Sequence, residues 1–438
     1  MKSLLLSFVA SAGLALSAAG LEFKVETDHP DAVYVCGERV VFTVSALADD
    51  GKLATTGTYR VVIDNFGPET NGWAEVDVAR KNPFVICGYP SGPGFLRLRV
   101  IGEVKNPTSF SSEFVWGAAV SPEKIVQKRA CPDDFDAFWA AGAARLEKEV
   151  PLDPRLEKDE ARSAKDGTFD WYQVSFATFG RRVYGWMSVP KGVIGSGRKV
   201  PGRVQVPGAG FGSWSQEGMS RAGAASLRMT VFPFAPSFDV EANRPVFEAF
   251  EKGLWGSAPR EPYYVHGICG AREDCYYHDV LLGINRAVDW FAAQDFVDAS
   301  DFTYNGTSQG GGFGLMLLGL NRRFTRGCIY VPALTGHFAH LDGRQDGWPG
   351  FRTRKLDADE AAIDRNAPYY DGVNFAQRIT VPVRFAVGFS DVVCAPHAVY
   401  SAYNVCTSPD KDIVNCPGMG HGVYGWVYER LDKWEEGK

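Results

Sequence analysis

One serine stands in a setting that can turn a weak hydroxyl into a nucleophile. Ser308 is the centre of a G-x-S-x-G sequence at residues 306–310, the only match to this pattern in the chain. An apolar, extended segment (302–305) runs into the motif, and a helix-forming segment (310–320) leaves it. Small residues around a serine allow the sharp strand-to-helix turn that pushes its hydroxyl out of a sheet. The pattern predicts a nucleophile elbow, and an ordinary glycine-rich turn is the alternative.

A serine nucleophile requires a base, normally a histidine that a carboxylate orients. Where the serine sits on such an elbow, the chain order is serine, acid, histidine. The histidines that follow Ser308 are His337, His340, His397 and His421. His421 lies between two glycines, just after the strand-like segment 412–415, and can reach a serine on a neighbouring loop. We therefore predict His421 as the base.

The acid is expected in the loop that closes the preceding strand. Segment 383–387 has a strand pattern, and Asp391 follows it, 83 residues after Ser308 and 30 before His421. An open α/β sheet builds its site at the carboxyl ends of its strands. We predict Asp391 as the acid, with a simple helix cap before residue 395 as the alternative.

Two backbone amides are expected to stabilise an oxyanion. Gln309 opens the helix after the elbow, so its N–H lies at the positive end of the helix dipole. The second amide should come from the glycine-rich segment 206–212, which follows a predicted strand. We assign it to Ala209, with Gly210 as the second choice and a plain glycine turn as the alternative.

The rest of the chain divides into three parts. Residues 1–19 have the basic start, apolar stretch and small residues of a cleaved signal peptide, which predicts a secreted or periplasmic protein. Residues 21–117 contain short strands separated by turns, and we predict an immunoglobulin-like β-sandwich. We expect it to act as a spacer or packing module, with a sugar-binding module as the alternative. Residues 125–438 alternate strands and helices, which predicts an α/β-hydrolase catalytic domain with a mostly parallel sheet.

Within this catalytic domain, alternating segments indicate the individual elements. Strands are expected at 183–189, 203–206, 229–232, 302–305, 328–331 and 383–387. Helices are expected at 279–291, 310–320 and 396–405.

Composition excludes several classes of function. The formal charge is −6 and no Lys/Arg run occurs, so nucleic acid is not an expected partner. After the signal segment, no stretch of 18 apolar residues predicts a membrane span. Aromatic residues make up 13% of the chain. This content suits stacking on sugars and a large aromatic core equally.

The nine cysteines show no CxxC pair with histidines at zinc-like spacing, so no metal site is expected. In an exported protein they can form disulfides, although an odd number leaves at least one free. Cys36 with Cys87, and Cys269 with Cys275, are the first pairs to check.

Three motifs resemble the acetyl xylan esterase and cephalosporin C deacetylase family (carbohydrate esterase family 7). They are G-T-S-Q-G-G at 306–311, S-D-V-V-C-A-P at 390–396 and G-H-G at 420–422. The resemblance covers roughly residues 131–429. It implies a secreted serine carboxylesterase that removes O-acetyl groups from xylan or other acetylated poly- or oligosaccharides. Members of the family commonly form rings, which implies a homo-oligomer without fixing the number of subunits. No cofactor is expected, because nucleophile, base and oxyanion hole complete the reaction.

Two motifs of the family differ in this sequence. Its Arg-Gly-Gln is replaced by F-P-F-A-P at 232–236, and its His-Gly-Tyr by P-G-A at 207–209. We therefore expect a reshaped acyl and sugar pocket. Phe211, Trp214 and Trp348 are candidates to refill it or to stack on a sugar ring, with core packing as an equal alternative.

Two other functions remain open at this point. One is a different secreted hydrolase of the same fold, such as a glucuronoyl esterase or a peptidase. The other is a carbohydrate-binding protein that has lost catalysis. The complete set of Ser308, Asp391 and His421 argues against the second.

Overall fold

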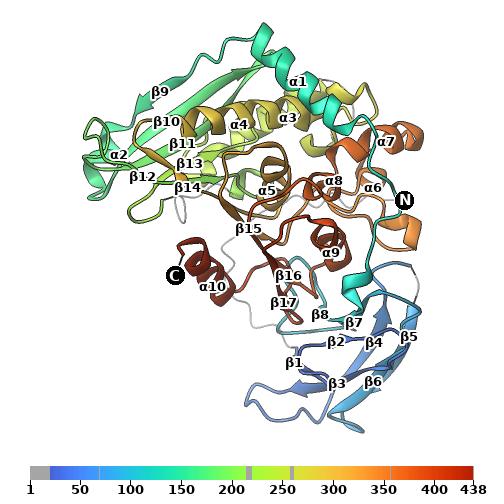
Figure 1. Cartoon of the computed structure of the whole chain (residues 1–438). Helices are drawn as coiled ribbons and strands as arrows, with labels where there is room; N and C mark the ends of the chain where they lie inside the picture. Colours follow the sequence, from blue (N-terminus) through green and yellow to red (C-terminus); the bar gives the residue numbers. More distant parts are fainter. Residues whose placement is uncertain (1–19, 69, 214–219, 257–260, 356, 438) are drawn as a thin grey trace.

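The computed structural model describes residues 20–68, 70–213, 220–256, 261–355 and 357–437. The predicted signal segment, residues 1–19, and Trp214 lie outside the described residues. Two regions follow one another along the chain, an N-terminal β region and a larger α/β region (Figure 1).

The α/β region is built on a sheet of nine strands in the order β17-β16-β15-β14-β12-β13-β11-β10-β9. Strands β12 to β17 run parallel to one another, whereas β9, β10 and β11 pair antiparallel, β11 also with β13. The strands are β9 (Arg155–Lys158), β10 (Phe169–Thr178), β11 (Arg181–Pro190), β12 (Val200–Gln205), β13 (Ala225–Met229), β14 (Val297–Thr307), β15 (Arg326–Tyr330), β16 (Val383–Gly388) and β17 (Lys411–Cys416).

Helices cover both faces of this sheet, as alternate residues of the interior strand β15 show. Ile329 belongs to the main core, whereas Cys328 and Tyr330 pack in a second cluster with Val427 and Leu431 of α10. Burial on both faces is what a parallel sheet requires. The helices are α1 (Phe135–Glu149), α2 (Glu160–Lys165), α3 (Val240–Trp255), α4 (Tyr276–Ala292), α5 (Gln309–Leu320), α6 (Phe351–Arg354), α7 (Glu360–Asn366), α8 (Gly372–Ala376), α9 (Pro396–Val405) and α10 (Gly425–Glu435).

One predicted strand is placed wrongly. The strand expected at 229–232 is β13, which ends at Met229. Beyond it the chain turns, and the Phe232 N–H donates to the Thr230 hydroxyl at 3.2 Å. Thr230, Val231 and Phe232 are all buried. A buried run of β-branched and aromatic residues has the composition of a strand whether or not it pairs with one.

The N-terminal region consists of two sheets, in the orders β1-β3-β6 and β2-β8-β7-β4-β5. Leu96, Leu98 and Val100 of β7 are buried in the core that the two sheets share, as their alternation predicts. The strands are β1 (Glu22–Thr27), β2 (Val33–Tyr34), β3 (Val40–Leu47), β4 (Thr58–Asp64), β5 (Thr70–Asp77), β6 (Phe84–Gly88), β7 (Gly94–Ile101) and β8 (Phe114–Val120).

Strand β8 of this region packs directly on the loops that follow β16 and β17 (Figure 1). The Gly117 N–H donates to the Pro417 carbonyl oxygen at 3.2 Å. A Cβ atom at Gly117 would lie 2.1 Å from the Phe389 carbonyl oxygen. Phe95 of β7 belongs to the main core and contacts the Phe389 ring at 5.1 Å. The N-terminal region therefore packs against the loops at the carboxyl ends of β16 and β17.

The nine cysteines are all free, so neither predicted disulfide forms. Cys275 is buried at the start of α4, whereas the Cys269 thiol lies 3.9 Å from the Asp359 carbonyl oxygen. Cys36 is exposed. Spacing along the chain does not bring two thiols to bonding distance, which is why these two predictions are wrong.

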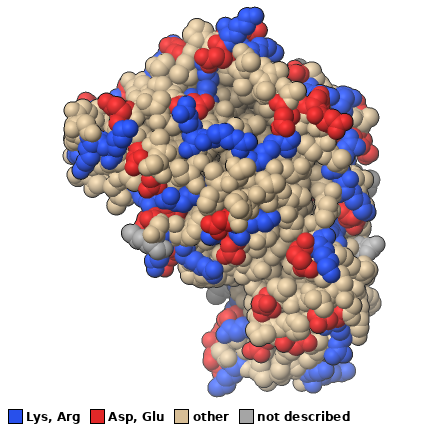
Figure 2. All heavy atoms as spheres, in the orientation of Figure 1, with Lys and Arg blue, Asp and Glu red and all other residues tan. Residues whose placement is uncertain are grey.

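The surface is mixed in charge. On the face shown in Figure 2, basic and acidic side chains occur together over both regions. Among the described helices, none is long and apolar enough to cross a membrane.

Candidate active site

Ser308 lies at a tight turn between β14 and α5. Its φ of 59° and ψ of −122° are strained for a residue other than glycine. Neighbouring glycines make this turn fit. A Cβ atom at Gly306 would lie 2.5 Å from the Gly310 carbonyl oxygen, and one at Gly310 would lie 2.0 Å from the Val206 carbonyl oxygen. This is the geometry of a nucleophile elbow.

The structure brings the three predicted side chains into one hydrogen-bonded chain. His421 Nε2 lies 2.9 Å from the Ser308 hydroxyl oxygen. His421 Nδ1 lies 2.9 Å from Asp391 Oδ2. The elbow follows β14, Asp391 follows β16 and His421 follows β17. Because these strands are parallel, their carboxyl ends lie at one edge of the sheet.

Asp391 is completely buried and held by its own loop. Its Oδ1 accepts hydrogen bonds from the backbone N–H groups of Val393 and Cys394, both at 2.8 Å. These bonds fix the carboxylate and leave Oδ2 directed at His421. The N-cap of α9 is Ala395 and accepts no side-chain hydrogen bond, so Asp391 does not take the alternative role of a helix cap.

The carboxylate determines the electrostatics of His421. Burial of the imidazole disfavours its cation, but the nearby charge of Asp391, together with the neighbouring Cys394, outweighs burial and raises the pKa of His421. The ring thus favours accepting a proton at Nε2, the nitrogen that faces Ser308. A base in this position is what a serine nucleophile requires.

The other three histidines make different contacts. His397 Nε2 lies 2.8 Å from the Gln345 carbonyl oxygen, and burial lowers the pKa of His397 to about 4. His340 Nδ1 lies 2.8 Å from Asp346. His337 is buried against the Phe351 ring. Of the four histidines considered, His421 is the one that the structure places on Ser308.

The Gln309 side chain ties the elbow to the predicted oxyanion loop. Its Oε1 accepts hydrogen bonds from the hydroxyls of Tyr263 and Tyr277, at 2.7 and 2.8 Å. Its Nε2 donates to the carbonyl oxygens of Pro207 and Gly208, at 3.4 and 3.3 Å. Burial raises the pKa of both tyrosines, so both hydroxyls stay protonated donors. Gln309 therefore links its own amide to the loop that carries Ala209.

The second-choice donor Gly210 has a partner of its own. Its N–H donates to the Tyr263 hydroxyl at 3.5 Å. Gly210 also adopts a φ of 81°, which glycine tolerates without strain. Ala209 precedes this turn and lies on the loop that Gln309 holds.

An aromatic cluster supports Tyr263 from behind. Phe232 and Phe234, at the position of the family's Arg-Gly-Gln, stack with ring centroids 5.3 Å apart. Phe232 also contacts Tyr263, at 5.3 Å, and Phe247 of α3, at 5.2 Å. The departure from the family motif thus fills this region with packed rings, which hold a hydroxyl that binds Gln309.

Changing Gln309 should slow catalysis without removing any predicted catalytic side chain. Gln309→Glu keeps an acceptor for the tyrosines but loses the amide hydrogens that bind Pro207 and Gly208. We expect kcat for p-nitrophenyl acetate to fall about 10- to 100-fold, because the loop with the second oxyanion donor is no longer held. In Gln309→Met, kcat should fall at least as far, and the free energy of unfolding should drop by about 1–3 kcal/mol for each hydroxyl left unpaired. A wild-type kcat in both variants would show that Gln309 does not position this loop.

Among the three substrate candidates, two are described. Phe211 begins a short 3-10 helix (Phe211–Ser213) and packs on α3, with its ring 5.5 Å from Phe247. Trp348 is only 7% exposed and contacts the Tyr264 ring at 4.4 Å. These contacts are those of packing residues. A substrate role for Phe211, Trp214 and Trp348 stays a prediction.

Asp391, Cys394 and His421 form the one group among the described residues whose possible metal-ligand atoms lie within 4.8 Å of one another. Two of these three are the hydrogen-bonded pair that faces Ser308. The closeness of these three residues therefore reflects the hydrogen-bonded acid–base pair of Asp391 and His421.

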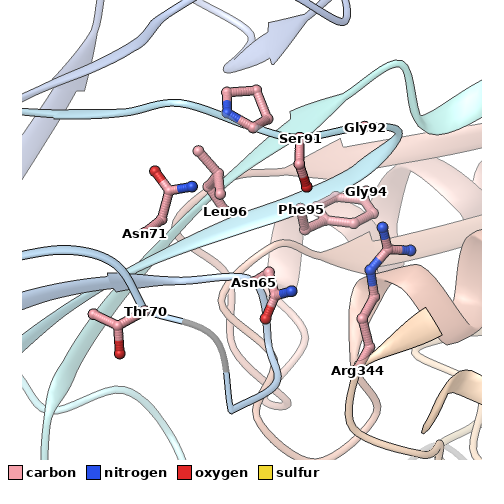
Figure 3. A pocket seen from close by; sticks show the side chains of 10 residues that line it. Asn65, Thr70, Asn71, Ser91, Gly92, Gly94, Phe95, Leu96 and Arg344 are labelled. Carbon is pink, nitrogen blue, oxygen red and sulfur yellow. The ribbon is translucent and has the colours of Figure 1, made fainter. Parts of the chain in front are cut away.

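A separate hollow of about 70 Å³ lies where the N-terminal region meets Arg344 (Figure 3). The Arg344 guanidinium enters it and donates to the Pro93 carbonyl oxygen. None of Ser308, Asp391 and His421 lines it. This hollow belongs to the contact between the two regions. Its lining residues are Asn65, Thr70, Asn71, Pro90, Ser91, Gly92, Gly94, Phe95, Leu96 and Arg344.

The sequence does not mark Tyr263 or Tyr277 as functional residues. They meet Gln309 across 46 and 32 positions of the chain. No local pattern encodes such a contact, because it depends on how α4 and the loop before it pack behind the elbow.

The strand order, the strained serine between β14 and α5, and the acid and histidine on the following strands together define an α/β-hydrolase. The sequence profile described as "Acetyl xylan esterase (AXE1)" matches residues 123–437. The chain therefore belongs to the acetyl xylan esterase (AXE1) family and is a carboxylic ester hydrolase.

Individual relatives agree with this assignment. The chain is 27% identical over 427 residues to the acetyl esterase Axe7A of Xylanibacter ruminicola, covering 94% of this chain and 92% of that protein. The acetyl xylan esterase of Paenibacillus sp. R4 shares the fold, with a TM-score of 0.61 and 22% identity over 72% of this chain and 98% of that one. Acetyl xylan esterase 1 of Thermoanaerobacterium sp. JW/SL YS485 has a TM-score of 0.59 and 21% identity over 72% and 96%.

Proposed function

We propose that the chain removes O-acetyl groups from xylan or other acetylated poly- or oligosaccharides through an acetyl-serine intermediate. Ser308 attacks the acetyl carbonyl carbon while His421 Nε2 takes the hydroxyl proton. The Gln309 and Ala209 amides stabilise the oxyanion, and His421 returns the proton to the departing sugar oxygen. Water, activated by His421, then hydrolyses the acetyl-enzyme and releases acetate.

The observation that supports this mechanism best is the unbroken hydrogen-bond chain from Ser308 through His421 to Asp391, with 2.9 Å at each step. This geometry is the one that acyl transfer needs, which supports the assignment of the three side chains as nucleophile, base and orienting acid. The acetylated-carbohydrate substrate is supported by the family and by the acetyl esterases to which the chain is similar.

A comparison of substrates tests this proposal. Acetate release from acetylated xylan should exceed cleavage of a methyl-glucuronate ester or of a peptide amide. Faster cleavage of either of those substrates would support a glucuronoyl esterase or a peptidase instead. A protein that resists a fluorophosphonate probe yet binds xylan would be a carbohydrate-binding protein without catalysis.

The acyl pocket should accept only a short chain. Because acetyl is the proposed group, p-nitrophenyl acetate should be cleaved with a kcat/KM at least about tenfold above that of p-nitrophenyl butyrate. Two misplaced methylenes can cost about 1–3 kcal/mol each in transition-state binding. The measurement is kcat/KM for acetate, propionate and butyrate esters. A butyrate value equal to that of acetate would show an open pocket and contradict a function restricted to deacetylation.

Three further parts of the proposal concern the whole chain. Residues 1–19 act as a cleaved signal for secretion or export to the periplasm, which N-terminal sequencing of the exported protein would test. The chain forms a homo-oligomer, for which light scattering is the measurement. The N-terminal region is immunoglobulin-like, a proposal supported by its two sheets around one core.

A further inference from the structure

A loop of the N-terminal region reaches the candidate catalytic histidine. The loop joins β7 to β8, and at its tip the Ser109 hydroxyl oxygen accepts a hydrogen bond from the Gly422 N–H at 3.0 Å. A Cβ atom at Gly420 would lie 2.6 Å from that same hydroxyl oxygen. The glycines on both sides of His421 are therefore in direct contact with the N-terminal region.

The next residue of this loop, Phe110, lies beside His421 itself. The two ring centroids are 5.4 Å apart and the ring planes are inclined by 74°. Phe110 is nevertheless 59% exposed, so it is not packed into a core. An apolar ring beside the Ser308, His421 and Asp391 side chains is placed to contact a substrate rather than to fill a core.

The backbone at Phe110 is strained. Its φ is 63°, in the left-handed region that a bulky side chain rarely adopts. Hydrogen bonds on either side hold the loop in this shape. The Ser111 N–H donates to the Thr108 carbonyl oxygen at 2.9 Å, and the Val115 N–H to the Thr108 hydroxyl at 2.8 Å. Strain that the surroundings enforce at an exposed aromatic residue points to function.

The chemistry of the proposed reaction identifies the part of the substrate that meets this ring. His421 Nε2 has to protonate the departing sugar oxygen, so the leaving sugar lies beside the imidazole. The acetyl group lies instead toward the Gln309 amide. Phe110, which flanks His421, is therefore on the sugar side of the site. The apolar face of a pyranose ring suits a flat aromatic surface.

We propose that the N-terminal region completes the active site and that Phe110 packs against the leaving sugar of the acetylated carbohydrate. This proposal rests on the proposed function. It replaces the role of spacer or packing module that the sequence predicts with one in substrate selection.

The test compares two esters with different leaving groups. In Phe110→Ala, the kcat/KM for an acetylated xylo-oligosaccharide, divided by that for p-nitrophenyl acetate, should fall about tenfold, chiefly through the KM of the oligosaccharide. Phe110→Tyr retains the aromatic ring and should restore most of the ratio. Trp73 is 62% exposed on β5, and Trp73→Ala is the matched control that should leave the ratio unchanged.

Phe110→Gly separates this role from folding. Glycine adopts a positive φ without strain, so the Tm should equal or exceed that of the wild type while the ratio still falls about tenfold. A ratio that stays at the wild-type value in both the Ala and the Gly variants would overturn the proposal. An equal fall in kcat for both esters would overturn it too, because Phe110 would then position His421 rather than the sugar. Failure of the wild type to release acetate from any acetylated sugar would instead contradict the proposed function.

Discussion

Replacing Ser308 by alanine should lower kcat for p-nitrophenyl acetate by about four orders of magnitude or more. The hydroxyl oxygen is the atom that would bond to the acetyl carbon, and it lies 2.9 Å from the His421 nitrogen that takes its proton. Without it no acetyl-enzyme can form, and the remaining groups can only stabilise attack by water. The same variant should resist a fluorophosphonate probe that labels the wild type.

The strained backbone supplies a control for this experiment. Alanine carries a Cβ like serine, so Ser308→Ala retains the strain at a φ of 59° and should melt close to the wild type. Ser308→Gly should be equally inactive but no less stable, because glycine tolerates this conformation. Ser300, exposed on the same strand, offers a matched serine whose change to alanine should leave kcat unaltered. Native activity in the Ser308→Ala protein would overturn the proposed mechanism.

The candidate site could be predicted from sequence because its residues carry local signals. The elbow requires glycines around Ser308, and Asp391 and His421 each follow a recognisable strand. The helix segments at 310–320 and 396–405 also match α5 and α9 closely. These signals are periodicity and backbone conformation, which neighbouring residues largely determine.

Long-range contacts could not be predicted in the same way. Phe110 reaches His421 because β8 packs on the loops after β16 and β17, and no pattern near residue 110 encodes that contact. In the sequence, the rings of Phe232 and Phe234 stood out as a departure from the family motif, and Phe232 also ended a predicted strand. Their role in holding Tyr263 depends on α3, which supplies Phe247.

The two unformed disulfides and the misplaced end of β13 were predicted wrongly for the same reason. The composition of 229–232 indicated burial correctly, but pairing is decided by the neighbouring strands, and β13 ends where its pairing with β11 does. The two cysteine pairs were suggested from sequence alone, whereas a disulfide requires proximity of two Cβ atoms in space.

Replacing Asp391 by asparagine should lower kcat by about four orders of magnitude and also change its dependence on pH. The asparagine side chain in Asp391→Asn can place an amide hydrogen on Nδ1 of His421, which would leave the ring proton on Nε2. That nitrogen could then no longer accept the Ser308 proton. The hydrogen bonds from Val393 and Cys394 to Oδ1 would still hold the side chain, so the fold should be retained.

The direction of the pH change follows from the charge that is removed. A base must be unprotonated, so kcat/KM should rise with pH through the pKa of His421. In the wild type Asp391 raises this pKa above the usual value of about 6.5. In Asp391→Asn the carboxylate charge is gone while burial, which lowers the pKa, remains. The midpoint of the acidic limb should therefore move to lower pH, as residual kcat/KM measured from about pH 4 to 10 would show. A midpoint that stays in place, or a loss below tenfold, would mean that Asp391 does not orient and charge the catalytic histidine.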